Sequence, residues 1–186
     1  MLSNNKKLIA VIGATGQQGG GVVRALQASG GQFKLRALTR NPDKHRELAE
    51  EVVEADLNRP ETLAAAFKGA YGVFLVTTSS LEGTDERKQG AAAVQAARDA
   101  GVKHVVWSTL PDVEAISGSR FHVPHFTNKA KVNRIVKDAG FANHTFAIAP
   151  FFYQNLARRH GSATAGRRIH GLGAPARSEC ALHSHG

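Results

Sequence analysis

A glycine-rich turn that joins a short apolar run to a helical pattern constrains the fold of this chain more than any other segment. Residues 8–12 are five consecutive apolar residues, rich in β-branched side chains, which is typical of a strand buried in a parallel sheet. Glycines then recur at Gly13, Gly16 and Gly19. Apolar residues follow at helical spacing between residues 18 and 29. The segment therefore predicts a strand, a tight turn and a helix in immediate succession.

The same switch between strand and helix patterns repeats along the chain as far as residue 149. The expected strands cover residues 8–12, 35–39, 52–55, 73–76, 105–107 and 145–149. The expected helices cover residues 18–29, a segment opened by Asn41-Pro42-Asp43, and residues 63–67, 85–100 and 125–139, with loops at residues 77–83 and 111–124. Such alternation favours an α/β domain, in which a Rossmann-like, doubly wound parallel sheet carries helices on both faces.

Composition excludes several other classes of protein. Apolar residues make up 42% and charged residues 21% of the 186 positions, as in soluble globular chains and unlike disordered or collagen-like ones. No apolar run is long enough to span a membrane, and the polar start of the chain does not suit a secretory signal. The single cysteine, Cys180, cannot form an internal disulfide, which fits a reducing compartment. We therefore expect a cytoplasmic protein with no membrane partner.

The last thirty residues differ in character from the rest. Residues 157–186 show neither the helical nor the strand period and are rich in Gly, Ala, Ser, Arg and His. They hold five arginines and one glutamate, so they carry nearly half of the formal net charge of +9. We expect a dinucleotide-binding domain over residues 1–156 and a poorly ordered basic tail over residues 157–186.

Two further kinds of ligand are not favoured. Basic residues in the body of the chain are not interleaved with aromatic ones, so the charge pattern does not favour a nucleic acid as a partner. Cys180, His183 and His185 could contact a soft metal, but structural metal sites usually need four ligands with supporting contacts. The sequence predicts no metal site.

The spacing of the three glycines, G-x-x-G-x-x-G, is a variant of the dinucleotide-binding fingerprint, and it stands where that fingerprint must stand. Gly13 would allow a sharp turn, Gly16 the approach of a pyrophosphate to the backbone, and Gly19 close packing of the helix on the strand. Backbone N–H groups and the positive helix terminus would then bind the anion. The alternative is a glycine-rich turn without a ligand; the strand and helix on either side favour nucleotide binding.

The end of the second expected strand distinguishes the two nicotinamide dinucleotides. NAD enzymes commonly place an acidic residue about twenty residues after the fingerprint, where it accepts the ribose hydroxyls. This chain has Arg40 there, and a planar guanidinium suits a 2′-phosphate. The sequence thus favours NADP(H) over NAD(H). The alternative is that Arg40 is only a surface residue beside a helix start.

Five blocks of sequence together resemble the NmrA-like group of atypical short-chain dehydrogenases. They are residues 13–20, 36–42, 70–77, 125–129 and 150–156, in this order. Within the group, the chain is similar to NADP(H)-binding redox sensors and nitrogen-metabolite regulators, and residues around Lys129 also resemble the neighbouring isoflavone-reductase-like enzymes. Members of the group usually run considerably longer, so the resemblance implies that the C-terminal substrate lobe is truncated here or that the reading frame is shifted.

The resemblance implies a set of cofactor-binding residues, most of them at the carboxyl ends of expected strands, where open α/β sheets bind ligands. The glycine loop would hold the pyrophosphate, Arg40 the 2′-phosphate, and the other residues would border the adenine, the ribose or the nicotinamide. The implied residues are Gly13, Ala14, Thr15, Gly16, Gln17, Gln18 and Gly19 of the loop, Arg40, then Asp56 and Leu57, then Thr77, Thr78 and Ser79, then Lys88 and Lys129, and finally Phe152, Tyr153, Gln154 and Asn155.

The usual catalytic acid is absent. Short-chain dehydrogenases place a tyrosine four residues before a lysine, which lowers the pKa of the phenol. Here the position four before Lys129 is His125, and neither Tyr71 nor Tyr153 falls there. Either Lys129 or His125 donates the proton, as the matching lysine is thought to do in isoflavone-reductase-like enzymes. Alternatively, Lys129 only binds the ribose and His125 packs or caps a helix start, which we favour. Ser108 ends the fifth strand, where related enzymes keep a substrate-polarising hydroxyl.

These features give one leading hypothesis and two alternatives. The leading one is an NADP(H)-binding protein that senses the redox state of the cofactor and passes it to a regulatory protein partner through loop ordering. The first alternative is an NADPH-dependent reductase of a small quinone, ketone or related unsaturated compound, with Lys129 or His125 as proton donor. The second is an interaction module on a relic fold that binds no cofactor.

Overall fold

The computed structural model describes residues 6–78, 85–149 and 152. The described helices and strands all lie within Met1–Pro150, which packs as one unit. The strands are β1 (Lys7–Val11), β2 (Phe33–Thr39), β3 (Glu51–Glu54), β4 (Gly72–Leu75), β5 (His104–Thr109) and β6 (Asn143–Ile148). The α-helices are α1 (Gln17–Gln27), α2 (Leu63–Phe67), α3 (Glu86–Asp99), α4 (Val113–Ile116) and α5 (Pro124–Asp138).

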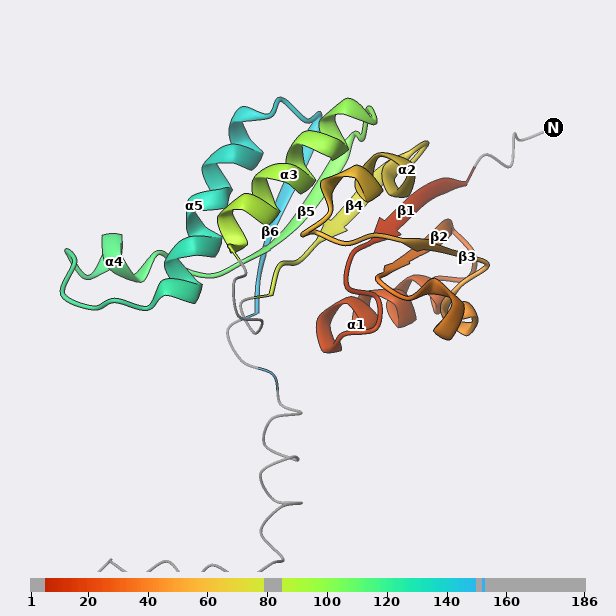
Figure 1. The fold of residues 1–186 in the computed structure, drawn as a ribbon, viewed down its shortest axis with the longest axis horizontal. Helices are drawn as coiled ribbons and strands as arrows, with labels where there is room; N and C mark the ends of the chain where they lie inside the picture. Colours follow the sequence, from red (N-terminus) through yellow and green to blue (C-terminus); the bar gives the residue numbers. More distant parts are fainter. Residues whose placement is uncertain (1–5, 79–84, 150–151, 153–186) are drawn as a thin grey trace, which may run out of the picture. The chain divides into compact units, whose positions relative to one another are not determined.

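The strands form one parallel sheet in the order β3-β2-β1-β4-β5-β6 (Figure 1). The chain runs outward from β1 to β3, crosses back to β4 beside β1, and then runs outward to β6. This order confirms the Rossmann-like, doubly wound sheet that the sequence predicts. It also places the reversal of strand order between β1 and β4, where sheets of this kind bind ligands.

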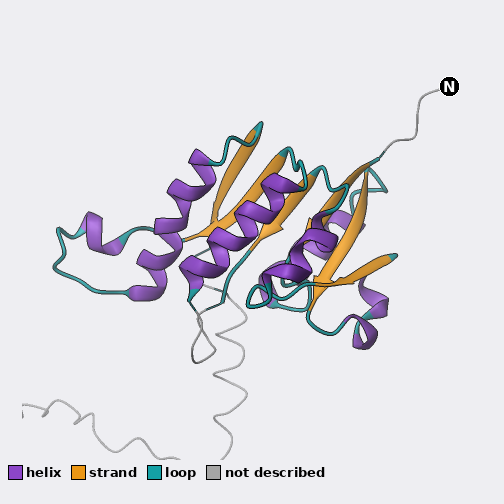
Figure 2. Ribbon diagram, turned by 45° about the horizontal axis from the view of Figure 1, so that its top comes forward, coloured by secondary structure: helices purple, strands orange, loops and turns teal. Residues whose placement is uncertain are grey.

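Helices cover both faces of the sheet (Figure 2). In β1, Ala10 packs into the core beneath α2, α3 and α5, whereas the next residue, Val11, packs into the core beneath α1. In β4, Val73 packs into the first of these cores and Phe74 packs into the second. A strand buried on both faces must be apolar at consecutive positions. This is why short unbroken apolar runs marked the strands in the sequence.

The prediction of a helix that begins at Asn41-Pro42-Asp43 is wrong. Two 3-10 turns, η1 (Pro42–Lys44) and η2 (Arg46–Leu48), fill this connection instead. The register pairs Arg36 with Glu51, so the chain returns along β2 by only three residues, about 10 Å, before β3 begins. Two single turns cover that distance. The connection also lacks a repeating apolar stripe that would stabilise a longer helix by packing.

The stretch 111–124, expected to be irregular, contains the single turn α4. Asp112 caps this turn, since its carboxylate accepts a hydrogen bond from the N–H of Ala115 at 3.1 Å. Within the turn, Glu114 lies 3.2 Å from Nδ1 of His122 and 3.5 Å from Nζ of Lys131. The hydrogen bond with His122 lowers the pKa of Glu114 below its ordinary value; burial opposes this shift and the charge of Lys131 adds to it.

We expect His122→Ala to raise the pKa of Glu114 towards its ordinary value, and Lys131→Ala to raise it less, because the hydrogen bond with His122 is the larger cause. NMR titration of the glutamate carboxyl carbons measures both shifts. A carboxyl whose pKa is depressed by folding stabilises the fold above its unfolded pKa, and this contribution is lost as the pH falls through the folded pKa. An unchanged pKa in the His122 variant would show that the pair does not form in solution.

Helices α3 and α5 approach each other at a point where only glycine fits. A Cβ built on Gly90 of α3 would stand 2.7 Å from Cγ2 and 2.8 Å from Cγ1 of Val132, a fully buried residue of α5. The β-branched valine has little rotamer freedom in a helix, so it cannot turn away. The absence of a side chain at Gly90 therefore sets the spacing of the two helices.

We expect Gly90→Ala to push α3 away from α5 and to lower the free energy of unfolding by about 1–3 kcal/mol. Adding Val132→Ala removes the clashing methyl groups, so the double variant should be more stable than the sum of the two single effects predicts. Urea unfolding of all four proteins measures this coupling. Strictly additive effects would contradict the steric account.

Candidate cofactor site

The turn between β1 and α1 has the geometry for which its glycines are needed. Gly13 has a φ of +65°, and a Cβ on it would stand 3.1 Å from Cγ1 of Val76. A Cβ on Gly19 would stand 2.2 Å from the carbonyl oxygen of Gly13 and 2.8 Å from that of Ile12. Helix α1 therefore begins directly against the end of β1. This geometry accounts for the sharp turn and the close packing assigned to these two glycines.

The N-terminus of α1 is open. No side chain caps this helix, and its first turn holds no acidic residue. Among the described residues, the backbone N–H groups of Gln17, Gln18 and Gly19 have no carbonyl acceptor, whereas the next one, that of Gly20, donates to Gly16 at 2.8 Å. In contrast, Asp85 caps α3 by accepting from two N–H groups. Unused donors at a positive helix end suit an anion, and no carboxylate of the first turn competes for them.

The ends of the neighbouring strands lie against this turn. The N–H of Ala14 donates to Leu38 of β2 at 3.2 Å, and the N–H of Ile12 donates to Phe74 of β4 at 3.0 Å. From β5, the hydroxyl of Ser108 donates to the side-chain oxygen of Gln18 at 2.9 Å. The structure thus brings the glycine loop together with the carboxyl ends of three strands. The hydroxyl considered for substrate polarisation is engaged with the loop itself.

Arg40 follows β2 immediately and is exposed. Its guanidinium makes no hydrogen bond or ion pair with any residue that the structure describes. Arg36, four residues earlier, behaves in the opposite way: it is 8% exposed and donates to the carbonyls of Ala66 and Lys68 at the end of α2. Of the two arginines in this strand segment, only Arg40 is available to a ligand.

The residues predicted to border the adenine lie after β3, and they hold their own loop together. The Asp56 carboxylate accepts from the N–H of Asn58 at 2.9 Å and lies 3.6 Å from Nε of Arg59. The pKa of Arg59 is raised, mainly by its hydrogen bond with Glu54. Leu57 packs partly against the main core. These contacts hold the loop after β3 in one conformation, next to the end of β2.

Lys129 of α5 reaches across to the end of β4. Its Nζ donates to the backbone oxygen of Thr77 at 2.7 Å and to the Thr77 hydroxyl oxygen at 2.8 Å, and it lies 2.8 Å from Oε1 of Glu86. The Thr77 hydroxyl donates in turn to Oε1 of Glu86 at 2.9 Å. Two hydrogen bonds and one ion pair thus hold the ammonium group in place. Lys129 therefore joins α5 to the end of β4 and the first turn of α3.

The remaining predicted residues are placed less closely. His125 lies in the first turn of α5, is exposed, and stacks edge-on against Phe126 at 4.8 Å between ring centroids. Lys88 is exposed on α3 and Thr78 is exposed after Thr77. Phe152 is partly buried. Four predicted site residues, Ser79, Tyr153, Gln154 and Asn155, lie outside the described residues, as do Cys180, His183 and His185.

The described residues contain neither a cluster of metal-binding side chains nor a helix that could span a membrane. Within residues 6–78 and 85–149, no three histidine, cysteine, aspartate or glutamate side chains gather so that they could hold a metal ion. No helix in the same ranges is long and apolar enough to cross a membrane.

Glu86 is the main site residue that sequence reasoning missed. It follows the N-cap Asp85, where an acidic residue is ordinarily exposed and favourable to the helix dipole. In the structure its side chain is 2% exposed. One signal was present: the buried residues of α3 follow a helical stripe of which Glu86 is the first member. The stripe consists of Glu86, Gln89, Gly90, Ala93, Val94 and Ala97.

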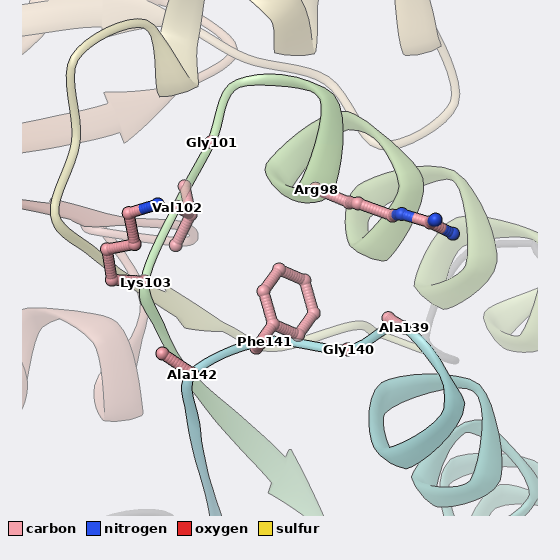
Figure 3. A pocket seen from close by; sticks show the side chains of 8 residues that line it. All are labelled: Arg98, Gly101, Val102, Lys103, Ala139, Gly140, Phe141 and Ala142. Atoms are coloured by element: carbon pink, nitrogen blue, oxygen red, sulfur yellow. The ribbon is translucent and has the colours of Figure 1, made fainter.

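A pocket of about 400 Å³ lies away from this site, at the ends of α3 and α5 and the starts of β5 and β6 (Figure 3). The ring of Phe141 occupies the middle of its lining in Figure 3, between the turn at Gly101 and the end of α5. None of the residues predicted to bind a cofactor lines it. It therefore lies at the amino ends of the strands, opposite the carboxyl ends at which the candidate cofactor site lies.

Comparison with known proteins agrees with this geometry. Residues 5–183 match the NmrA-like family. The chain is 36% identical over 157 residues to the NmrA-like oxidoreductase FrzB of Cladobotryum sp, covering 78% of this chain and 46% of FrzB. Its fold is similar to that of triphenylmethane reductase of Citrobacter sp., solved with NADP(H), with a TM-score of 0.68, 28% identity, and coverage of 81% and 51% of the two chains.

A second similar structure is that of NmrA, a negative transcriptional regulator solved in complex with NADP, with a TM-score of 0.69 and 29% identity. The match covers 81% of this chain and 47% of NmrA, which has also been solved with NAD. The chain thus spans about half the length of the proteins it matches. The family match and the shared sheet show that this chain belongs to the NmrA-like family.

Proposed function

We propose that this chain binds NADP(H) across the carboxyl ends of β2, β1 and β4 and reports the redox state of the cofactor to a protein partner. One observation carries the proposal: the uncapped N-terminus of α1, with its unused N–H groups, follows a turn that contacts the end of β2, and β2 is followed directly by an exposed arginine with no partner among the described residues. The donors and the charge fit a dinucleotide with an additional phosphate. When bound, the cofactor supplies a nicotinamide ring that accepts or gives a hydride.

The side chains around Lys129 favour a sensor over an enzyme in which this lysine is the acid. Its ammonium group already donates two hydrogen bonds to Thr77 and pairs with Glu86, and its side chain is only 12% exposed. To give a proton to a substrate, the ammonium would have to leave these partners inside a buried network, which is costly. Lys129 is therefore suited to hold the end of β4 in place.

Reduction of a small quinone, ketone or related compound is the second candidate function. FrzB is named an oxidoreductase and the Citrobacter protein a triphenylmethane reductase. In this chain, the imidazole of His125 is a freer proton donor than Lys129, because it is exposed and its ring makes no hydrogen bond with the described residues. NADPH consumption with a panel of such acceptors, lost in His125→Ala and kept in His122→Ala, would favour this function over the sensor.

We expect Arg40→Ala to weaken NADPH binding about 10- to 100-fold and to leave NADH binding unchanged. The reason is that a charge-assisted hydrogen bond contributes about 1.5–3 kcal/mol, and only NADPH carries the 2′-phosphate. Isothermal titration with both cofactors measures the change. Arg46→Ala is the matched control, since Arg46 is exposed but already pairs with Asp43. A wild-type protein that binds NADPH and NADH equally would contradict this role of Arg40.

A further inference from the structure

The ion pair of Glu86 and Lys129 differs from all others in the described part of the chain. Its two side chains are 2% and 12% exposed, whereas every other described ion pair has at least one side chain that is 45% exposed or more. A buried ion pair is costly to desolvate, and an apolar pair of similar size often stabilises a protein equally well. Packing alone therefore does not explain why charges occupy these two positions.

Both side chains of the pair contact Thr77, which lies just after the end of β4. Thr77 bridges it, since its hydroxyl donates to Glu86 and accepts from Lys129. The residue before Thr77, Val76, lies next to the glycine turn, because its Cγ1 is 3.1 Å from the Cβ that Gly13 lacks. The second carboxylate oxygen of Glu86 is buried and has no hydrogen-bond partner among the described residues. Two opposite charges of low accessibility thus stand directly beside the proposed site.

The order of the strands indicates which half of the cofactor comes near this pair. The pyrophosphate is the middle of a dinucleotide, and the turn after β1 is its proposed seat. Arg40 follows β2 on one side of β1 and would hold the adenosine half through its 2′-phosphate. Strand β4 flanks β1 on the other side. The nicotinamide half must therefore extend over the end of β4, towards Thr77.

We infer that the opposite charges of Glu86 and Lys129 balance each other, so that neither charge biases the relative affinity of the site for oxidised and reduced cofactor; this rests on the proposed function. The two forms differ at the nicotinamide ring by one positive charge. The intact pair has no net charge and discriminates little. Without the Glu86 charge, Lys129 repels the oxidised ring, and without the Lys129 charge, Glu86 attracts it. An uncompensated unit charge interacts with a second one by about 1 kcal/mol when water screens the two strongly, which corresponds to an affinity change of about fivefold.

The test compares dissociation constants of NADP⁺ and NADPH, measured by isothermal titration at low temperature. Glu86→Gln should raise the ratio of the NADP⁺ constant to the NADPH constant about fivefold, and Lys129→Met should lower it about fivefold. The double variant, in which both positions are neutral, should return within twofold of wild type. Glu51→Gln is the control: it breaks the pair with Arg36 on the β2–β3 side, and the ratio should not change.

The ratio remains valid even if a variant is partly unfolded, because the unfolded fraction lowers both apparent affinities by the same factor. Shifts of both single variants in the same direction, or shifts below twofold, would overturn the inference while leaving cofactor binding intact. A wild-type protein that binds neither form would instead overturn the proposed function, and this inference with it. The two failures are therefore distinguishable.

Discussion

Gly19→Ala is expected to abolish NADPH binding and to lower the free energy of unfolding by about 3 kcal/mol or more. The new Cβ would stand 2.2 Å from the carbonyl oxygen and 2.6 Å from the carbonyl carbon of Gly13. Both are backbone atoms, so no side-chain rotation relieves the overlap. Helix α1 would have to move away from β1, which would displace the N–H groups of its first turn. Urea unfolding and a NADPH titration measure the two effects.

Gly21→Ala in the same helix is the matched control. A Cβ there meets only Nη2 of the Arg24 side chain, at 4.0 Å. Because alanine is a better helix former than glycine, this variant should be more stable by about 0.5–1 kcal/mol and should bind NADPH as wild type does. Equal stability and affinity in the Gly19 and Gly21 variants would show that α1 does not pack against β1 as closely as the structure indicates.

The glycine turn could be predicted from sequence because its constraints are local. The apolar run, the three glycines and the helical pattern follow each other directly, so the strand, the turn and the helix appear in the structure at residues 7–11 and 17–27 with boundary shifts of one or two residues. The doubly wound parallel sheet followed from the same alternation, since crossover connections between parallel strands allow few topologies, whereas the order of the six strands comes from the structure.

The features that were missed depend on which residues meet after folding. The burial of Glu86 follows from the packing of α3 on α5, and its place at the start of the buried stripe of α3 is the one local feature that distinguishes it from an exposed acidic residue in a first helical turn. The close contact of Gly90 with Val132 joins positions 42 residues apart. The short connection from β2 to β3 depends on the register of Arg36 with Glu51, which the sequence of either strand does not specify.

The sequence left two roles open for Lys129, proton donor or ribose ligand, and the structure adds a third. Its contacts with Thr77 and Glu86 tie together three elements that meet at the proposed nicotinamide end of the site. A residue that holds the site together need not take part in chemistry. The stability of lysine variants distinguishes this role from the other two, because neither of those requires that folding depend on Lys129.

Lys129→Met is expected to lower the free energy of unfolding by about 3–5 kcal/mol, because it leaves the 2% exposed carboxylate of Glu86 without a counter-charge. Glu86→Gln should cost less, since Lys129 keeps both acceptors on Thr77. Combining the two changes removes both charges, so the double variant should be more stable than Lys129→Met alone. Urea unfolding of the four proteins measures these differences and the coupling between the two positions.

Lys131→Met provides the matched control on the same helix. Its side chain is 45% exposed and lies 3.5 Å from Glu114, a pair that water screens, so its loss should change stability little. If Lys129→Met and Lys131→Met were equally mild, the Glu86–Lys129 pair would not be the buried link that the distances indicate. Lys129 would then be free to move towards a substrate, and the reductase would become the stronger of the two candidate functions.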